Sequence, residues 1–155
     1  KAFAKDYEIT DAQIKRNTLL LELRSARYPK RLKIEIRREL REWDYQRTIA
    51  FTKYSTRQVL VKAHTLQQTI ENKIQAFLAR GEIRDCFDIE FLIRRGAKLP
   101  IGSGDRVVEL REKISKFKDR DFKVKLGSIV EEDIRTYYIE NRFSFLDATL
   151  AALSR

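Results

Sequence analysis

The chain has 155 residues, of which 43% are hydrophobic and 36% are charged, and it contains only five glycines and two prolines. This balance is typical of one folded domain with a buried core, and it excludes a disordered chain, a collagen-like repeat and a low-complexity linker. The net charge of +10 favours partners rich in negative charge, such as nucleic acid, nucleotide phosphates or an acidic protein.

The residue inventory also bears on where the protein works. Cys86 is the single cysteine, so no disulfide can form within the chain, and we expect a cytoplasmic protein with a buried, inert thiol. The sequence has no signal-peptide pattern and no apolar run long enough to span a membrane. The chain begins with Lys1 and contains no methionine, so we expect it to be a fragment or a processed product.

The first half has the pattern of strands. Residues 17–24 (NTLLLELR) are apolar, and residues 31–37 (RLKIEIR) alternate between apolar and charged side chains, which places Lys33, Glu35 and Arg37 on one face. A short polar link that contains a proline joins them, so the two segments are predicted to pair as an antiparallel hairpin. Two shorter strand candidates follow, at residues 49–54 and 59–63.

The second half has the pattern of helices. Thr65 and Gln68 form a capping box that begins a helix, and Gly81 is placed to end it. A second capping box, Ser128 with Glu131, is predicted to begin a later helix. The further helices are predicted at residues 83–95, 105–118, 128–141 and 143–153.

Strands followed by helices predict an α+β fold. The expected architecture is a small antiparallel or mixed sheet in residues 1–64, followed by a helical bundle in residues 65–155. The sequence has no internal repeat, and it has neither the glycine-rich dinucleotide-binding pattern nor a phosphate-binding P-loop.

A cation and an acid occupy unusual places on the first two predicted helices. Projected at 100° per residue, Lys73 falls beside the apolar stripe of its helix and Asp85 falls in the middle of the next stripe. Because an unpaired buried ammonium is costly, Lys73 should pair with a carboxylate or point into a pocket. One interpretation is an ion pair that only joins two helices. The other is a phosphate-binding lysine that Asp85 holds in place, with Asp88 one turn further along.

Glu35 also has two interpretations. With Lys33 and Arg37 on the same face of a strand, it could belong to a row of solvated charges. Alternatively it is a metal ligand, because Mg²⁺ binds oxygen atoms and commonly takes one or two carboxylates together with substrate phosphates.

Three blocks of sequence resemble the AbiEii/AbiGii family of nucleotidyltransferase toxins. Residues 69–92 (TIENKIQAFLARGEIRDCFDIEFL) match a helix with E-x-K-x-x-A and an arginine, followed by R-D-x-x-D and an apolar residue. Upstream, residues 32–36 (LKIEI) match a K-x-[DE] strand, and LLLELR and YPKR precede it in the expected order. The resemblance covers about residues 17–96.

The resemblance implies roles for individual residues. Glu35 would be the third acid of a polymerase-β-like Mg²⁺ site, Lys73 would contact the phosphates of a nucleoside triphosphate, and Asp85 would be the acid of the final motif. Lys33 and Arg80 would assist in binding phosphate.

Asp88 and Arg84 would support the final motif. The implied activity transfers a nucleoside monophosphate to a tRNA or protein acceptor, and the implied partner is a cognate antitoxin.

One expected motif is missing. The family's glycine-containing turn and D-x-D strand should lie before residue 32, but residues 1–16 contain neither a glycine nor that pattern. The chain by itself is therefore expected to be inactive. The alternative function is a non-catalytic basic module that binds RNA or a protein. Tyr137, Tyr138 and Phe143, near Arg135 and Arg142, either form its binding surface or pack between helices.

Overall fold

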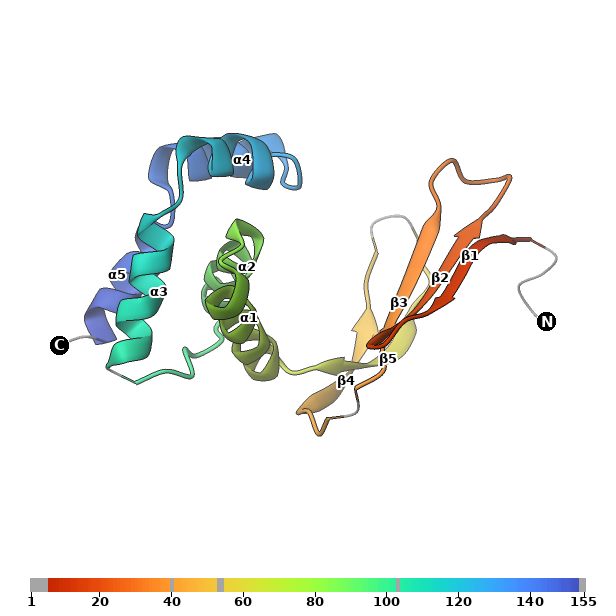
Figure 1. Cartoon of the computed structure of the whole chain (residues 1–155), viewed down its shortest axis with the longest axis horizontal. Coiled ribbons are helices and arrows are strands. Elements are labelled where there is room, and N and C mark those ends of the chain that lie inside the picture. Colours follow the sequence, from red (N-terminus) through yellow and green to blue (C-terminus); the bar gives the residue numbers. More distant parts are fainter. Residues whose placement is uncertain (1–5, 40, 53–54, 103, 154–155) are drawn as a thin grey trace. The chain divides into compact units, whose positions relative to one another are not determined.

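The computed structural model describes residues 6–39, 41–52, 55–102 and 104–153 (Figure 1). The chain divides into two compact units, Lys1–Glu42 and Trp43–Arg155. Small antiparallel sheets precede the helices along the chain, which confirms the predicted α+β class. The predicted division at residue 65 separates strands from helices rather than compact units, and it stays a prediction.

The first unit contains a three-stranded antiparallel sheet in the order β1-β2-β3. The predicted hairpin is confirmed as β2 (Thr18–Arg24) and β3 (Leu32–Arg37), with Leu20 opposite Glu35. The edge strand β1 (Glu8–Ile14) was not predicted, because the sequence EITDAQI alternates only weakly between apolar and polar side chains. It pairs with β2 through an irregularity between Ile9 and Asp11.

The sheet has two chemically different faces, because residues opposite each other on antiparallel strands point to the same side. One face is apolar and includes the cross-strand pairs Leu19 with Ile36 and Leu21 with Ile34. The β3 residues on this face, Leu32, Ile34 and Ile36, are exposed. The alternation of residues 31–37 was therefore interpreted correctly.

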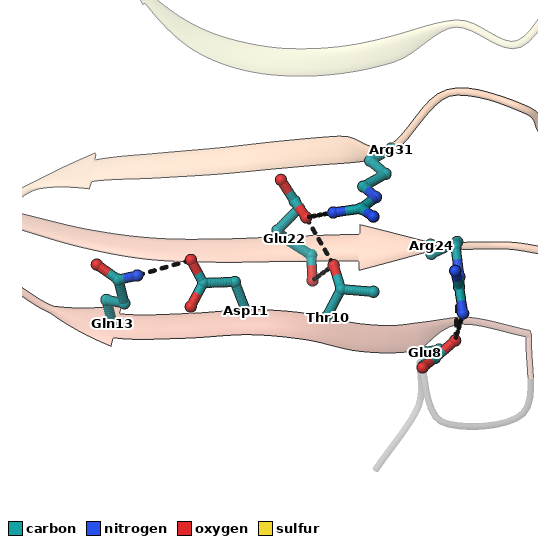
Figure 2. A network of polar contacts seen from close by, with 7 residues as sticks. All are labelled: Glu8, Thr10, Asp11, Gln13, Glu22, Arg24 and Arg31. Carbon is teal, nitrogen blue, oxygen red and sulfur yellow. Dashed lines mark hydrogen bonds and ion pairs between the residues drawn. The ribbon is translucent and has the colours of Figure 1, made fainter.

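The other face of the sheet is polar, and Figure 2 shows its contacts near Glu22. The carboxylate of Glu22 accepts hydrogen bonds from the Thr10 hydroxyl at 2.8 Å and from Arg31 at 2.7 Å. The Thr10 bond first, and then the Arg31 bond, lower the pKa of Glu22 below its ordinary value. Arg24 and Glu8 form a further ion pair at 2.7 Å between β2 and β1 (Figure 2).

The second unit begins with an antiparallel hairpin of β4 (Tyr45–Ala50) and β5 (Val59–His64). The prediction for β5 was correct to within a residue. The prediction for residues 49–54 was displaced: β4 starts four residues earlier, in the polar segment YQRTIA, and ends at Ala50, while residues 53–54 lie outside the described ranges. The hairpin leads directly into the first helix. At this junction the Thr65 amide donates a hydrogen bond to the Asp44 carbonyl at 3.2 Å.

Helix α1 (Leu66–Arg80) begins and ends as predicted. The Thr65 hydroxyl accepts a hydrogen bond from the Gln68 amide at 3.0 Å. The side chain of Gln68 does not complete the reciprocal bond of a capping box but accepts from the Asp44 amide. At the other end Gly81 adopts a left-handed conformation, with φ of 66°, and its amide donates to the Phe77 carbonyl. This turn brings α2 (Ile83–Arg94) back along α1 (Figure 1).

The later helices differ more from their predictions. Helix α3 (Asp105–Ser115) ends three residues early, and a π-helical segment, η1 (Asp121–Leu126), was not predicted. The Ser128 capping box is wrong: α4 (Glu132–Asn141) begins after Glu131, and the Ser128 hydroxyl donates to the Lys125 carbonyl in the turn after η1. Helix α5 (Ser144–Leu153) agrees with its prediction.

The helices of the second unit enclose one core, which confirms the predicted bundle. Its fully buried side chains come from five of the helical elements, and α4 adds the nearly fully buried Tyr138. They are Ile70 and Phe77 of α1, Ile89 of α2, Val107 and Leu110 of α3, Leu126 of η1, and Leu146 and Leu150 of α5. Aromatic rings fill the space between the later elements, with Phe122 and Phe143 at 5.4 Å between centroids. This packing fixes α1 and α2, which carry most of the predicted site.

Candidate functional site

Asp85 is the centre of a charged cluster where α1 turns into α2. Its side chain is completely buried, although it lies in the first turn of α2. The guanidinium of Arg80, the last residue of α1, donates from Nε to Asp85 Oδ2 at 2.6 Å and from Nη2 to Oδ1 at 2.7 Å. Two parallel bonds of this kind are the strongest and most directional arrangement between these two groups. The cluster therefore ties the end of α1 to the start of α2.

Lys73 joins the cluster from the middle of α1. Its ammonium lies 3.5 Å from Asp85 Oδ1 and 2.5 Å from Asp88 Oδ2. The prediction that Lys73 pairs with a carboxylate is confirmed. The side chain of Lys73 is 32% exposed, so its charge lies at the surface of the unit rather than in its interior. The closest carboxylate is that of Asp88, not that of Asp85.

The electrostatics make Asp85 an ionised anchor. Burial by itself would raise the pKa of Asp85, but the hydrogen bonds and charge of Arg80, and then those of Lys73, outweigh burial and lower it. In return, the hydrogen bond to Asp85 raises the pKa of Arg80. At neutral pH the cluster thus holds two cations against two carboxylates, and one of those carboxylates is inaccessible to water.

Toward the residues that the structure describes, the two cations keep hydrogen-bond donors that have no partner. A lysine ammonium has three donors, and Asp85 and Asp88 account for two of them. A guanidinium has five donors, of which Asp85 receives two. The Arg80 side chain is 58% exposed, so its remaining donors are accessible. The arrangement is able to bind an anion with several oxygen atoms, such as a phosphate chain, while Asp85 keeps both cations oriented.

Arg84, predicted to support this motif, lies in the first turn of α2 with an exposed side chain. The structure describes no ion pair between Arg84 and the neighbouring carboxylates.

Glu35 and Lys33 lie on the polar face of the three-stranded sheet, in the other compact unit. Their side chains form an ion pair at 2.7 Å, and both are more than half exposed. The hydrogen bond and charge of Lys33 lower the pKa of Glu35, and Glu35 raises the pKa of Lys33. A metal ion at Glu35 would therefore have to displace the Lys33 ammonium.

The described side chains do not assemble a metal site. Over the ranges that the structure covers, no group of three or more histidine, cysteine, aspartate or glutamate side chains could hold an ion. Glu35 offers a single carboxylate, and Asp85 and Asp88 already bind cations. These residues alone therefore do not fit a Mg²⁺ ion.

A second buried acid, Glu90, was missed in the sequence. Its side chain is fully buried in α2, where Oε1 accepts hydrogen bonds from Arg94 at 2.9 Å and from the Tyr138 hydroxyl at 3.1 Å. Oε2 accepts from the amide of Leu146 at 3.1 Å, in the first turn of α5. Glu90 thus joins α2 to α4 and α5. The signal available in the sequence was its position directly after the core residue Ile89, but helical periodicity does not identify which residues would pair with Glu90.

The aromatic residues considered for a binding module pack mostly inside the bundle. Tyr138 is 5% exposed and Phe143 is 2% exposed, so for these two the helix-packing interpretation is confirmed. Tyr137 is partly exposed, and its hydroxyl accepts from Arg94 at 2.8 Å. Arg142 binds Asp119 at 2.5 Å, and Arg135 is exposed.

Cys86 is buried, as predicted. Burial first, and then the charges of Glu90 and Asp85, raise the pKa of its thiol well above the ordinary value. The thiolate that a nucleophile needs is therefore disfavoured. In the described part of the chain, no helix has both the length and the apolar character needed to cross a membrane.

Comparisons with known proteins address the chain as a whole. Neither the comparison with curated proteins nor that with solved structures gave a match. Among protein families, residues 2–149 match the family described as nucleotidyl transferase AbiEii toxin of type IV toxin–antitoxin systems. The match covers both compact units, including the sheet and the α1–α2 cluster. The chain therefore belongs to the AbiEii family of nucleotidyltransferase toxins.

Proposed function

We propose that the α1–α2 cluster holds the phosphates of a nucleoside triphosphate for transfer of a nucleoside monophosphate to an acceptor hydroxyl. The observation that carries the proposal is the buried carboxylate of Asp85, which binds the Arg80 guanidinium through two hydrogen bonds and also contacts Lys73. A helix junction can be tied together without charge, and a buried ion pair adds little net stability. Two cations kept oriented at the surface suit an anionic ligand better.

The reaction makes clear what the cations would contribute. The oxygen of the acceptor hydroxyl forms a bond to the α-phosphorus, the bond from that phosphorus to the pyrophosphate group breaks, and the hydroxyl proton passes to water. Negative charge gathers on the phosphate oxygens and on the pyrophosphate. Lys73 and Arg80 stabilise this charge and orient the triphosphate, which are the main contributions a protein makes to phosphoryl chemistry.

Each acid of the cluster has a distinct part in this proposal. Asp85 is a positioning residue: it touches the cations and not the substrate. Asp88 contacts the Lys73 ammonium at 2.5 Å, and an incoming phosphate oxygen would compete with this carboxylate. Arg84 is exposed beside the cluster and would add a further positive charge near the phosphates.

We propose Mg²⁺ as the cofactor of this reaction, because its charge would neutralise that of the phosphates. On the three-stranded sheet, Glu35 would offer one oxygen ligand to such an ion after release from Lys33, and Lys33 would then be free to bind a phosphate. The remaining ligands would have to come from residues other than those described. Because residues 1–16 contain no D-x-D pattern, we propose that the chain by itself does not catalyse the transfer.

The experiment is nucleotidyl transfer by the full-length gene product. Each labelled nucleoside triphosphate is supplied with Mg²⁺ together with total tRNA or total protein as acceptor. We expect Lys73→Gln and Arg80→Gln to lower the rate about 100-fold or more, as the loss of one charge-stabilising donor typically does. Lys98→Gln, which removes an exposed cation near the end of α2, is the matched control. Equal rates for all three variants and the wild type would refute the assignment.

The partners and the location are proposals on the same basis. The family consists of toxins from toxin–antitoxin systems, so we propose a cognate antitoxin for this protein. The single buried thiol suits a reducing compartment, and we propose the cytoplasm as the place of action.

A further inference from the structure

The β4–β5 hairpin has an unusual composition. Residues 45–64 (YQRTIAFTKYSTRQVLVKAH) contain four lysines and arginines and no aspartate or glutamate. The whole chain, in contrast, has 23 acids for 33 lysines and arginines. Positive charge that is not offset within its own element is the electrostatic signature of a surface that binds a polyanion.

The register places this charge on one face. Tyr45 pairs with His64, Arg47 with Lys62, and Ile49 with Leu60. Opposite residues of an antiparallel pair share a face, so these six side chains lie together. All six are exposed.

The cationic pair at the centre of this face is unfavourable in the free protein. Arg47 and Lys62 lie directly opposite each other, and like charges in this position destabilise a hairpin. Among the described residues neither makes an ion pair with a carboxylate, and the Lys62 ammonium lies 3.4 Å from the centroid of the Tyr45 ring. A bound anion would relieve this repulsion.

Aromatic and polar groups continue the surface beyond the strands. Tyr45 is 55% exposed on the face itself, and Phe51, directly after β4, is 91% exposed. Phe51 and Arg57 also line a cavity of about 880 Å³ at the loop end of the hairpin, between β4 and β5. Exposed aromatic rings beside cations are what single-stranded nucleic acids require, since bases stack on the rings and phosphates contact the cations.

We propose that the β4–β5 hairpin binds a single-stranded segment of RNA. Arg47, Arg57 and Lys62 contact its phosphates, and Tyr45 and Phe51 stack against its bases. The choice of RNA rests on the proposed function, in which the bound strand is the acceptor or part of it. The assignment of a polyanion-binding surface to the hairpin rests on the charge and exposure of its side chains.

The test is direct binding of a fluorescent 20-nucleotide oligo-uridine RNA to the chain, without nucleoside triphosphate or Mg²⁺. The triple variant Arg47→Gln, Arg57→Gln, Lys62→Gln should bind roughly tenfold more weakly. The slope of log affinity against log salt should become less steep by about 2, because three single-strand phosphate contacts are lost. Phe51→Ala should weaken binding by about tenfold through lost stacking.

Two controls separate the hairpin from general charge and from misfolding. The triple variant Arg106→Gln, Lys116→Gln, Lys123→Gln removes the same charge from exposed positions on other elements and should retain binding within about threefold. The variant Arg47→Lys, Arg57→Lys, Lys62→Arg keeps the charge of the hairpin and should also retain binding.

Equal weakening by the hairpin triple and by the control triple would overturn the proposal, as would the absence of RNA binding at 50 mM salt. Hairpin-dependent binding of oligo-glutamate in place of RNA would overturn it in favour of an acidic protein partner. Lys73→Gln lies outside the hairpin, so RNA binding by this variant should persist even if the nucleotidyl-transfer proposal fails.

Discussion

Replacing Asp85 with asparagine tests whether this acid anchors the α1–α2 junction. The substitution keeps the size of the side chain but removes its charge, and it places an amide donor where Arg80 donates at 2.6 and 2.7 Å. A hydrogen bond to a charged group contributes about 1.5–3 kcal/mol, and a buried donor without a partner costs about 1–3 kcal/mol. Since Arg80 and Lys73 are partly exposed and regain water, we expect Asp85→Asn to lower the free energy of unfolding by about 2–4 kcal/mol.

The assay is urea unfolding followed by circular dichroism at 222 nm, which reports the helices of the second unit. Asp88→Asn is the matched control: its side chain is 30% exposed, and a surface ion pair contributes about 1 kcal/mol or less. An Asp85→Asn variant as stable as the Asp88→Asn variant would refute the anchoring argument.

The same comparison has a defined pH dependence. The pKa of Asp85 is lowered in the folded protein, so its stabilisation is complete above the unfolded value of about 3.9 and is lost as pH falls through the lower folded value. The stability difference between wild type and Asp85→Asn should therefore be constant near neutral pH and shrink below about pH 4. A difference that persists unchanged in acid would show that charge is not its cause.

Three further predictions concern the packing around the cluster. Glu90→Gln should lower the free energy of unfolding of the second unit by about 2–4 kcal/mol, because the buried carboxylate accepts a hydrogen bond from the Leu146 amide. Hydrogen exchange of that amide should become faster, and unchanged exchange would contradict the role of Glu90 in joining α2 to α5. Cys86 should resist a thiol reagent at pH 8 until urea unfolds the protein, since burial raises its pKa; rapid labelling of the native protein would contradict this. Gly81→Ala should lower the free energy of unfolding by about 1–2 kcal/mol through backbone strain at its positive φ, because nothing lies within 4 Å of the added methyl group. An unchanged free energy of unfolding would contradict this explanation.

The local features of the fold were accessible from sequence where one physical signal dominated. The cap at Thr65, the left-handed turn at Gly81 and the alternation in β3 each follow from backbone chemistry within a few residues. Helical periodicity likewise placed Asp85 in a buried stripe, and the structure buries it completely. These signals need no knowledge of the partner elements.

The partners themselves were not accessible. Periodicity could not show that Arg80 rather than Lys73 would be the principal partner of Asp85, because that depends on the turn at Gly81. The Ser128 capping box failed because the π-helical segment before it leaves Ser128 in a turn. The absence of acids in residues 45–64 was visible in the sequence, but only the strand register places Arg47 opposite Lys62.

Titration of the chain with a nucleoside triphosphate, and separately with inorganic tripolyphosphate, tests the central claim most directly. The account predicts binding that weakens about tenfold or more in Lys73→Gln and in Arg80→Gln, and that is unchanged in Arg106→Gln, an exposed cation on α3. Equal affinity in the wild type and all three variants, measured by calorimetry, would contradict it, because the cations at Asp85 would then serve only to hold two helices together.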